Sequence, residues 1–375
     1  MNESIENSFI DYDDQFELPH ELKMQVNDNE ENNFFNATIH CLTNIRSFWA
    51  LVYNNNDYKD DNQKSFYNFI NSISNCIQNK TEKNICETEK EIEKYSKSIL
   101  SDIYLFKNKS THDPRLFIDC ILNYFLKEKN EKKKENENES KILNLSKDYI
   151  DNSCSLYISN LESNNYEPYK YKIILKKTKI CKNEKCGKVS EFYKYFSSLH
   201  FYLNYNKEKT YTIYDCFKNY LNKKNEEIEY ICPICYKNSK IESNISFYYL
   251  TNSLIIFIYY GDEKDKNIYQ DFYYQFEEII DFSKTGFVND NIKNKKYILS
   301  SIIVCKHPKD EEELFYTYCR KDYESLFWVY NSFDIRGNFK TIKDKIIKLK
   351  DEKLKKNRSF PYVLVYTQFV DNKNN

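Results

Sequence analysis

The chain has 375 residues, with 56 Lys and Arg against 57 Asp and Glu, which gives a formal net charge of −1. This length is enough for one large domain or two medium ones with buried cores. The near-neutral charge argues against direct binding to a membrane surface or to nucleic acid. A nucleic acid is expected as a partner only indirectly, through a complex. No apolar run approaches the roughly 18 residues of a transmembrane helix.

The N-terminal half is predicted to be helical after a polar start. Residues 1–28 are polar and lack the basic and apolar regions of a signal peptide, so we expect a lead-in segment and an intracellular location, nuclear or cytoplasmic. Residues 33–125 show mostly helical periodicity, beginning with an amphipathic helix near Phe34. Residues 127–140 contain no apolar side chain and are predicted to be a solvated insertion, because their charges alternate in sign.

From residue 166 onward the pattern favours β-structure. Strands are expected at residues 169–176, 195–203, 247–260, 297–304, 314–319 and 362–367, with a short helix at 213–221. A helical part followed by a mixed β part predicts an α+β domain. Any active groove is expected between the two parts.

Two cysteine pairs have the spacing of metal-binding knuckles. Four residues separate Cys181 from Cys186, and Pro-Ile separates Cys232 from Cys235, about 45 residues further on. Four thiolates on two short loops make the closed tetrahedral site of structural zinc. Metal ligation is expected rather than disulfides in a chain without a secretion signal. The sequence therefore predicts structural zinc here, and the alternative is two unrelated pairs of reduced thiols.

Residues 33–42 (NFFNATIHCL) have the form of a nucleophile box without its nucleophile. A reactive cysteine is expected directly before such a helix, because a helix N-terminus stabilises a thiolate. Asn33 occupies that position. Asn is among the best N-cap residues, so it can preserve the helix start without providing a nucleophile.

These motifs agree, in order, with one family, and the chain resembles the ubiquitin-specific proteases. These are papain-like cysteine enzymes that cleave after the C-terminal Gly of ubiquitin. The family's first box reads roughly G-N-T-C-[FY]-x-N-[AS]-x-[LI]-Q-x-L. Phe34, Asn36, Ala37, Ile39 and Leu42 match its tail.

Further boxes follow in the family's order. Asp113 and Phe117 match Q-D-A-x-E-F-L, whose Gln and Glu are absent here. The other similar segments are residues 213–217, 250–256 (L-P-x-x-L-x-I in the family), 278–283 (E-x-L-D-L-S), 297–304 and 361–366. The similarity covers nearly the whole chain, and the shared order of the boxes makes chance matching an inadequate explanation.

The resemblance implies a papain-like fold with a helical thumb, a mixed-β palm and zinc-ribbon fingers. It assigns residues 29–368 to this domain, residues 177–245 to the fingers and residues 369–375 to a polar tail. It also implies ubiquitin or a ubiquitin-like protein as a partner, and other protein partners.

The departures from the family fall on the catalytic residues. The family's Cys aligns with Asn33, and its general-base His aligns with Leu314. The third member, an Asp or Asn after Trp328, falls at Asn331 or Ser332. An Asn carboxamide is a poor nucleophile, and Leu cannot accept a proton. The predicted catalytic positions Asn33, Leu314 and Asn331 are therefore those of a degenerate triad.

The Cys and His residues that lie near these positions in the sequence do not restore the triad. Cys41 lies roughly 12 Å further along the helix at about 1.5 Å per residue. His40 is interpreted as a helix-face residue, and His307 as a surface or turn residue. We therefore favour a catalytically inactive pseudoenzyme that acts as a ubiquitin- or protein-binding scaffold. The alternatives are an active, divergent deubiquitinase with a different triad and a zinc-ribbon nucleic-acid binder, against which the net charge argues.

Overall fold

The computed structural model describes the chain in segments. These are residues 33–45, 48, 64, 66–68, 70, 113–125, 173–187, 189–203, 210–221, 228–232, 235–260, 273–285, 290–308, 314–320, 327–331, 336–338, 340, 342 and 357–369. The chain forms two compact units, the first from residues 1–125 and 299–367 and the second from residues 126–298 and 368–375. The predictions for residues 1–28, 127–140 and 370–375 lie outside the described residues.

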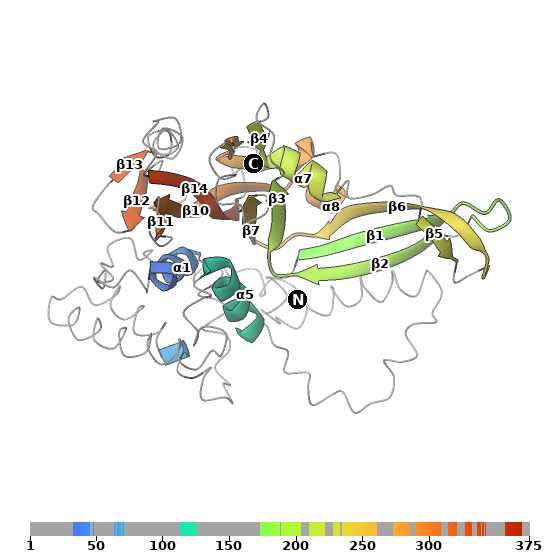
Figure 1. The fold of residues 1–375 in the computed structure, drawn as a ribbon, viewed down its shortest axis with the longest axis horizontal. Helices are drawn as coiled ribbons and strands as arrows, with labels where there is room; N and C mark the ends of the chain where they lie inside the picture. Colours follow the sequence, from blue (N-terminus) through green and yellow to red (C-terminus); the bar gives the residue numbers. More distant parts are fainter. Residues whose placement is uncertain are drawn as a thin grey trace, which may run out of the picture. The chain divides into compact units, whose positions relative to one another are not determined.

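The first unit contains an antiparallel sheet with two described helices. The helices are α1 (Asn33–Thr43) and α5 (Pro114–Phe125), and the strands are β10 (Lys296–Pro308, which starts in the second unit), β11 (Leu314–Arg320), β12 (Phe327–Asn331), β13 (Arg336–Asn338) and β14 (Asn357–Phe369). The strand order is β13-β12-β11-β10-β14, and Figure 1 shows α1 and α5 beside this sheet. The Phe117 ring of α5 lies 5.7 Å from Phe34 and 5.3 Å from Phe35, so the two helices share a core.

Helix α1 is more buried than its amphipathic sequence suggested, because the polar residues Thr38, His40 and Thr43 are buried together with its apolar face. At its C-terminal end, the Thr43 hydroxyl donates to the Ile39 carbonyl at 2.8 Å. The next residue, Asn44, donates from Nδ2 to the Ser300 carbonyl and to Ser301 Oγ of β10, both at 3.1 Å. These bonds satisfy polar groups that burial would otherwise leave unpaired.

The second unit contains a four-stranded antiparallel sheet of order β2-β1-β6-β5. Its strands are β1 (Ile173–Cys181), β2 (Val189–Phe196), β5 (Ile228–Ile231) and β6 (Asn238–Tyr249). The remaining elements are β3 (Leu199–Leu203) parallel to β7 (Ser253–Tyr260), β4 (Thr210–Thr212) parallel to β8 (Tyr273–Gln275), α7 (Ile213–Leu221), β9 (Ile279–Asp281) beside the start of β10, the 3-10 helix η7 (Phe282–Lys284) and α8 (Asp290–Lys293).

Helix α7 begins with a capping box and ends in an aromatic core. The Asp215 N–H donates to Thr212 Oγ1 at 3.1 Å, and the Thr212 N–H donates back to Asp215 Oδ2 at 3.1 Å. The Phe217 ring lies 5.8 Å from Phe247 and 5.3 Å from Phe282 in edge-to-face arrangements. The predicted helix at 213–221 is therefore confirmed.

The structure confirms mixed α+β architecture and corrects several strand limits. The expected single strand at 247–260 is two strands, because the chain turns at Leu250 to Asn252, where the Tyr297 hydroxyl donates to the Thr251 carbonyl at 2.7 Å. The expected strand at 195–203 likewise divides into the end of β2 and β3. Both breaks fall on short polar groups, Ser197-Ser198 and Thr251-Asn252-Ser253, which are turn signals within otherwise apolar stretches.

The strand expected at 169–176 is β1, which runs from Ile173 to Cys181. Its polar second half, Lys-Lys-Thr-Lys, does not look like a buried strand in sequence. Pairing with β2 on one side and β6 on the other holds it extended. Tertiary pairing overrides the low strand propensity of Lys at these positions.

Candidate functional site

Helix α1 and strand β11 lie side by side and run in the same direction. The Thr317 hydroxyl donates to the Ala37 carbonyl at 2.7 Å, and the Cys319 thiol lies 3.6 Å from the His40 carbonyl oxygen. The second contact lies further toward the C-terminal end than the first on both elements, at His40 after Ala37 on α1 and at Cys319 after Thr317 on β11. The start of α1 and the start of β11 are therefore at the same end of this pair.

The three predicted triad positions lie around this end. Asn33 is the first residue of α1, at the helix start that the sequence predicted. Leu314 is the first residue of β11 and is half-buried. Asn331 is the last residue of β12 and is the pairing partner of Thr317. Ser332, the other candidate for the third position, lies outside the described residues.

Neither face of β11 presents a proton acceptor at its start. The strand pairs with β10 in an unbroken register from Leu314 to Cys319, so its side chains alternate between two faces. Leu314 shares one face with Tyr316, and Phe315 shares the other with Thr317, which contacts α1. Both Leu314 and Phe315 are hydrocarbon side chains, so neither of the first two described residues of this strand can act as a general base.

Three described thiols of this unit, Cys41, Cys120 and Cys319, have a raised pKa. Burial raises the pKa of Cys41 well above its ordinary value, with a further increase from the Cys319 thiol and a smaller opposing effect from Ser301. Burial raises the pKa of Cys319 to about 12, and it also raises the pKa of Cys120. A protonated, buried thiol is a poor nucleophile. Cys76, Cys86 and Cys154 lie outside the described residues.

His40 is a buried core residue. Its side chain is 6% exposed, and within the described part of the chain its Nε2 atom has no hydrogen-bond partner. Burial lowers the pKa of His40 from 6.5 to about 4, so the ring is neutral at pH 7. The interpretation of this residue as part of the helix packing is consistent with this burial. His307 lies in β10, whereas His20 and His112 lie outside the described residues.

This depressed pKa predicts a pH-dependent stability. Below pH 6.5 the unfolded chain gains a proton at His40 that the folded chain does not take up until about pH 4. Stability is therefore complete above pH 6.5 and falls as the pH decreases toward 4, by about 3 kcal/mol for this residue. Urea unfolding at pH 7 and pH 5 should show a smaller loss for H40Q than for the wild type. Equal losses in the two proteins would contradict this account.

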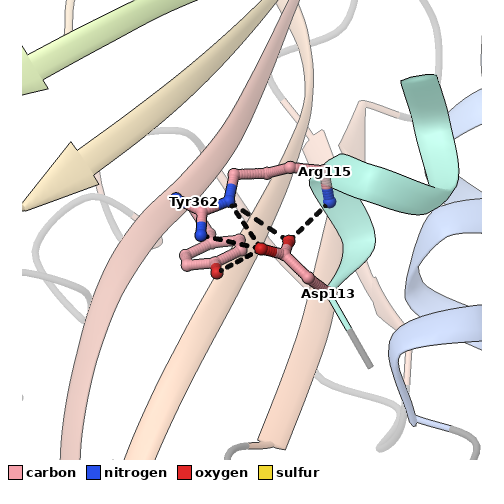
Figure 2. Close-up of polar contacts among 3 residues, drawn as sticks. All are labelled: Asp113, Arg115 and Tyr362. Carbon is pink, nitrogen blue, oxygen red and sulfur yellow. Dashed lines mark hydrogen bonds and ion pairs between the residues drawn. The ribbon is translucent and has the colours of Figure 1, made fainter. Parts of the chain in front are cut away.

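Asp113 organises the start of α5, as Figure 2 shows. Asp113 Oδ1 accepts from the Arg115 N–H at 2.8 Å, and Oδ2 accepts from Arg115 Nη2 at 2.7 Å and from the Tyr362 hydroxyl at 3.1 Å. The Arg115 guanidinium stacks 4.0 Å above the Tyr362 ring, and Arg115 is 2% exposed. This cluster ties α5 to β14.

The sequence predicted only one member of this cluster. Asp113 was matched to a family box, and the Asp-Pro pair is a helix-start signal with Pro114 at the first helical position. The sequence signal that could have added Arg115 to this cluster is its position two residues after Asp113, the residue before the helix. Tyr362 could not have been assigned to it, because 249 residues separate Tyr362 from Asp113.

The four predicted metal ligands come together at one end of the four-stranded sheet. Cys181 ends β1 and Cys186 lies in the following turn, while Cys232 follows β5 and Cys235 precedes β6. Their Sγ atoms all lie within 4.8 Å of one another, and Cys186 and Cys232 are 3.9 Å apart. None of the described cysteines forms a disulfide.

Each loop has a tight turn that directs its thiols inward. The N–H groups of Cys186 and Gly187 donate to the Asn183 carbonyl at 2.8 and 3.0 Å, and Gly187 has a φ of 55°. In the second loop the Tyr236 N–H donates to the Cys232 carbonyl at 2.8 Å, and Tyr236 also has a φ of 55°. Left-handed residues of this kind close short loops after a turn.

The cluster fits a tetrahedral metal. Zinc–sulfur bonds of about 2.3 Å place tetrahedral sulfurs about 3.8 Å apart, close to the separation of Cys186 and Cys232. Four cysteines complete the coordination and leave no position for water, so such a site is structural and not catalytic. The structure therefore shows a four-thiol cluster that is compatible with a metal ion.

Comparisons with known proteins place the fold. No protein-family profile and no curated protein sequence matches the chain. Among solved structures, the SAGA Ubp8/Sgf11/Sus1/Sgf73 DUB module bound to ubiquitin aldehyde matches with a TM-score of 0.58 and 14% identity, over 91% of this chain and 68% of that chain. The same module bound to monoubiquitin gives 0.57 and 13%, over 91% and 67%. A yeast SAGA DUB module with an Sgf73 variant gives 0.55 and 12%, over 91% and 67%.

The chain thus has a fold similar to that of a ubiquitin-specific protease, with an α+β body and a four-cysteine cluster. The matched protein in these structures is Ubp8 of the SAGA DUB module. At 12–14% identity this likeness establishes the fold alone. In the described part of the chain, no helix is long and apolar enough to cross a membrane.

Proposed function

We propose that this protein is a ubiquitin-specific protease-like scaffold that binds ubiquitin or another protein without hydrolysing it. The observation that carries the proposal is the composition of the shared end of α1 and β11. Asn33 stands there in place of a thiol, and Leu314 and Phe315 stand in place of a base. The domain that we assign to this function comprises residues 29–368.

The described thiols support the absence of hydrolysis. Cys41 and Cys319 lie near one another, since each interacts with Ser301, but burial keeps both protonated. Thiol hydrolysis needs a thiolate, a base within hydrogen-bond reach and a donor for the oxyanion. Losing the first two should remove many orders of magnitude of rate, because triad residues act as a unit.

Structural zinc is part of this proposal. Cys181, Cys186, Cys232 and Cys235 would hold the ion, which would fix the ends of β1, β5 and β6 as a zinc ribbon. Thiol ligation requires reducing conditions, which supports a nuclear or cytoplasmic location.

The proposal predicts no covalent reaction with ubiquitin electrophiles. Ubiquitin propargylamide should give no adduct with the wild-type protein, and ubiquitin-amidomethylcoumarin should not turn over, because no thiolate lies at the start of α1. Mass spectrometry of the intact protein measures the first result and fluorescence the second. Thiol-dependent labelling of the wild type, abolished by mutation of one cysteine, would establish the active divergent deubiquitinase instead.

The N33C variant distinguishes a scaffold that binds ubiquitin from a scaffold that binds another protein. A cysteine at the start of a helix has a lowered pKa and is reactive. If ubiquitin is still bound with its tail at α1, N33C should form the adduct that the wild type does not. Titration calorimetry with ubiquitin gives the affinity. Millimolar or absent binding, with no adduct on N33C, would assign the scaffold to another protein.

A further inference from the structure

Positive charge is concentrated on one hairpin of the four-stranded sheet. Residues 173–196, which contain β1 and β2, include seven Lys and two Glu, a net charge of +5 in a chain whose total is −1. One of the two acids, Glu191, lies 3.0 Å from Lys176 Nζ. The whole-chain charge therefore conceals a basic segment of the kind that attracts polyanions.

The register defines a basic face on this sheet. Lys177 and Lys179 are half-buried and share one face of β1, about 7 Å apart at the rise of a strand. Lys176 lies on the other face with Glu191, because side chains alternate along β1. The same face as Lys177 and Lys179 carries Ser243 of β6, the pairing partner of Lys179. We call Lys177, Lys179 and Ser243 the basic face.

A hydroxyl group on this face has no partner within the described part of the chain. Ser243 Oγ is buried and makes no hydrogen bond there. A buried polar atom of this kind costs stability unless something satisfies it. Because Ser243 Oγ is closed off from solvent, the half-buried ammonium groups of Lys177 and Lys179 are the groups of this face that a phosphate can reach.

The metal site does not account for Lys177. A zinc ion with four thiolates carries a formal charge of −2, which the lysines of its own loop, Lys182 and Lys185, would offset. Lys177 is four residues from Cys181, about 13 Å along the strand. That distance exceeds the screening length of about 8–10 Å at physiological salt.

An exposed aromatic ring lies at the cysteine end of the same sheet. Tyr236 is 81% exposed and follows Cys235 directly, and Ile231 before Cys232 is 65% exposed. An exposed ring beside lysines is the combination with which proteins bind single-stranded nucleic acids, because bases stack on the ring and phosphates lie on the cations. In a duplex the base faces are already stacked, so a protruding ring favours a single strand.

We propose that this sheet binds single-stranded nucleic acid, with phosphates on Lys177 and Lys179 and a base stacked on Tyr236. Lysine binds phosphate as a point charge and needs no fixed geometry, which suits a flexible strand. Neither the nucleophile position nor the general-base position takes part. The proposal therefore stands or falls separately from the scaffold function.

Fluorescence anisotropy with labelled 20-mers of oligo(U) and oligo(dT) tests this site in the full-length, zinc-loaded protein. The K177Q/K179Q variant should bind about tenfold or more weakly at low salt. Its slope of log affinity against log salt should fall by about 1.4, or about 0.7 for each phosphate that the variant no longer neutralises. The matched control is K284Q/K293Q, which removes two exposed lysines of the same unit outside the sheet and should bind as the wild type does.

Tyr236 provides a second, independent variant. Its exposure means that Y236A should fold normally, as circular dichroism and zinc content would check. Y236A should bind about tenfold more weakly, while Y236F retains affinity. Stronger binding to oligo(U) than to oligo(dT) would identify RNA as the source of the strand, and equal binding would indicate that both are accepted.

Three results would overturn the proposal. The first is no binding of either 20-mer by the wild type at about 50 mM salt, and the second is an equal decrease in affinity for the two lysine variants. The third is tighter binding of a Glu-rich peptide of equal charge, with no effect of Y236A on either probe. That last outcome would assign the basic face to an acidic protein segment.

Discussion

Replacing Cys232 with Ser is expected to abolish stoichiometric metal binding and to unfold the end of the four-stranded sheet. The Cys232 side chain is 3% exposed, and its sulfur lies 3.9 Å from that of Cys186. Structural zinc supplies about 10–16 kcal/mol of apparent binding free energy in small zinc domains, so its loss exceeds the stability of most folds. Metal analysis should give one zinc per chain for the wild type and less than a tenth of that for C232S.

The matched control for this variant is C216A, which removes another buried thiol of the same unit. Cys216 lies in α7 and is not part of the four-thiol cluster. C216A should keep its zinc, and limited proteolysis should leave residues 173–249 intact, whereas C232S should be cut there. A zinc-free wild-type protein that resists proteolysis equally well would refute a structural role for the metal.

Replacing Arg115 with Ala is expected to destabilise the first unit by roughly 3 kcal/mol. The guanidinium is almost fully buried, so its loss leaves the Asp113 carboxylate without its ion pair and leaves the Tyr362 ring without the stacked group. The Asp113 side chain is 22% exposed, which lets water solvate the carboxylate in part and places the cost at the lower end for buried pairs. Urea unfolding followed by far-UV circular dichroism measures this loss.

A neighbouring variant and a double mutant test the mechanism. L116A changes an exposed residue of the same helix and should cost less than about 0.5 kcal/mol. The double mutant D113N/R115A should lose less than the sum of the two single mutants, because each single change leaves an uncompensated partner. Additive losses would mean that Asp113 and Arg115 do not stabilise the unit as an ion pair.

Local patterns predicted the features of this protein that depend on short stretches of sequence. The knuckle spacing identified Cys181, Cys186, Cys232 and Cys235, and the structure brings these four sulfurs together. The limits of α7 were correct, because its capping box and apolar spacing lie within a short segment of the chain. The resemblance in the order of the motifs anticipated the fold that the solved structures then matched.

Patterns failed where a neighbouring element decided the conformation. The lysine-rich half of β1 is a strand because β2 and β6 pair with it, and no local signal records that pairing. The break between β6 and β7, by contrast, falls on Thr251 and Asn252, which are polar turn residues that the prediction of one long strand overlooked. Net charge is likewise a sum over 375 residues and does not show the +5 of one hairpin.

The sequence by itself thus determined which residues occupy the catalytic positions of the family-like boxes, and it identified the four candidate metal ligands. Only the tertiary structure decided the chemical state and the surroundings of those positions. The pKa values of Cys41 and His40 follow from burial, and α1 meets Thr317 of β11 across 280 residues of chain. Burial and contacts of this range depend on the packing of distant segments, which a linear pattern does not encode.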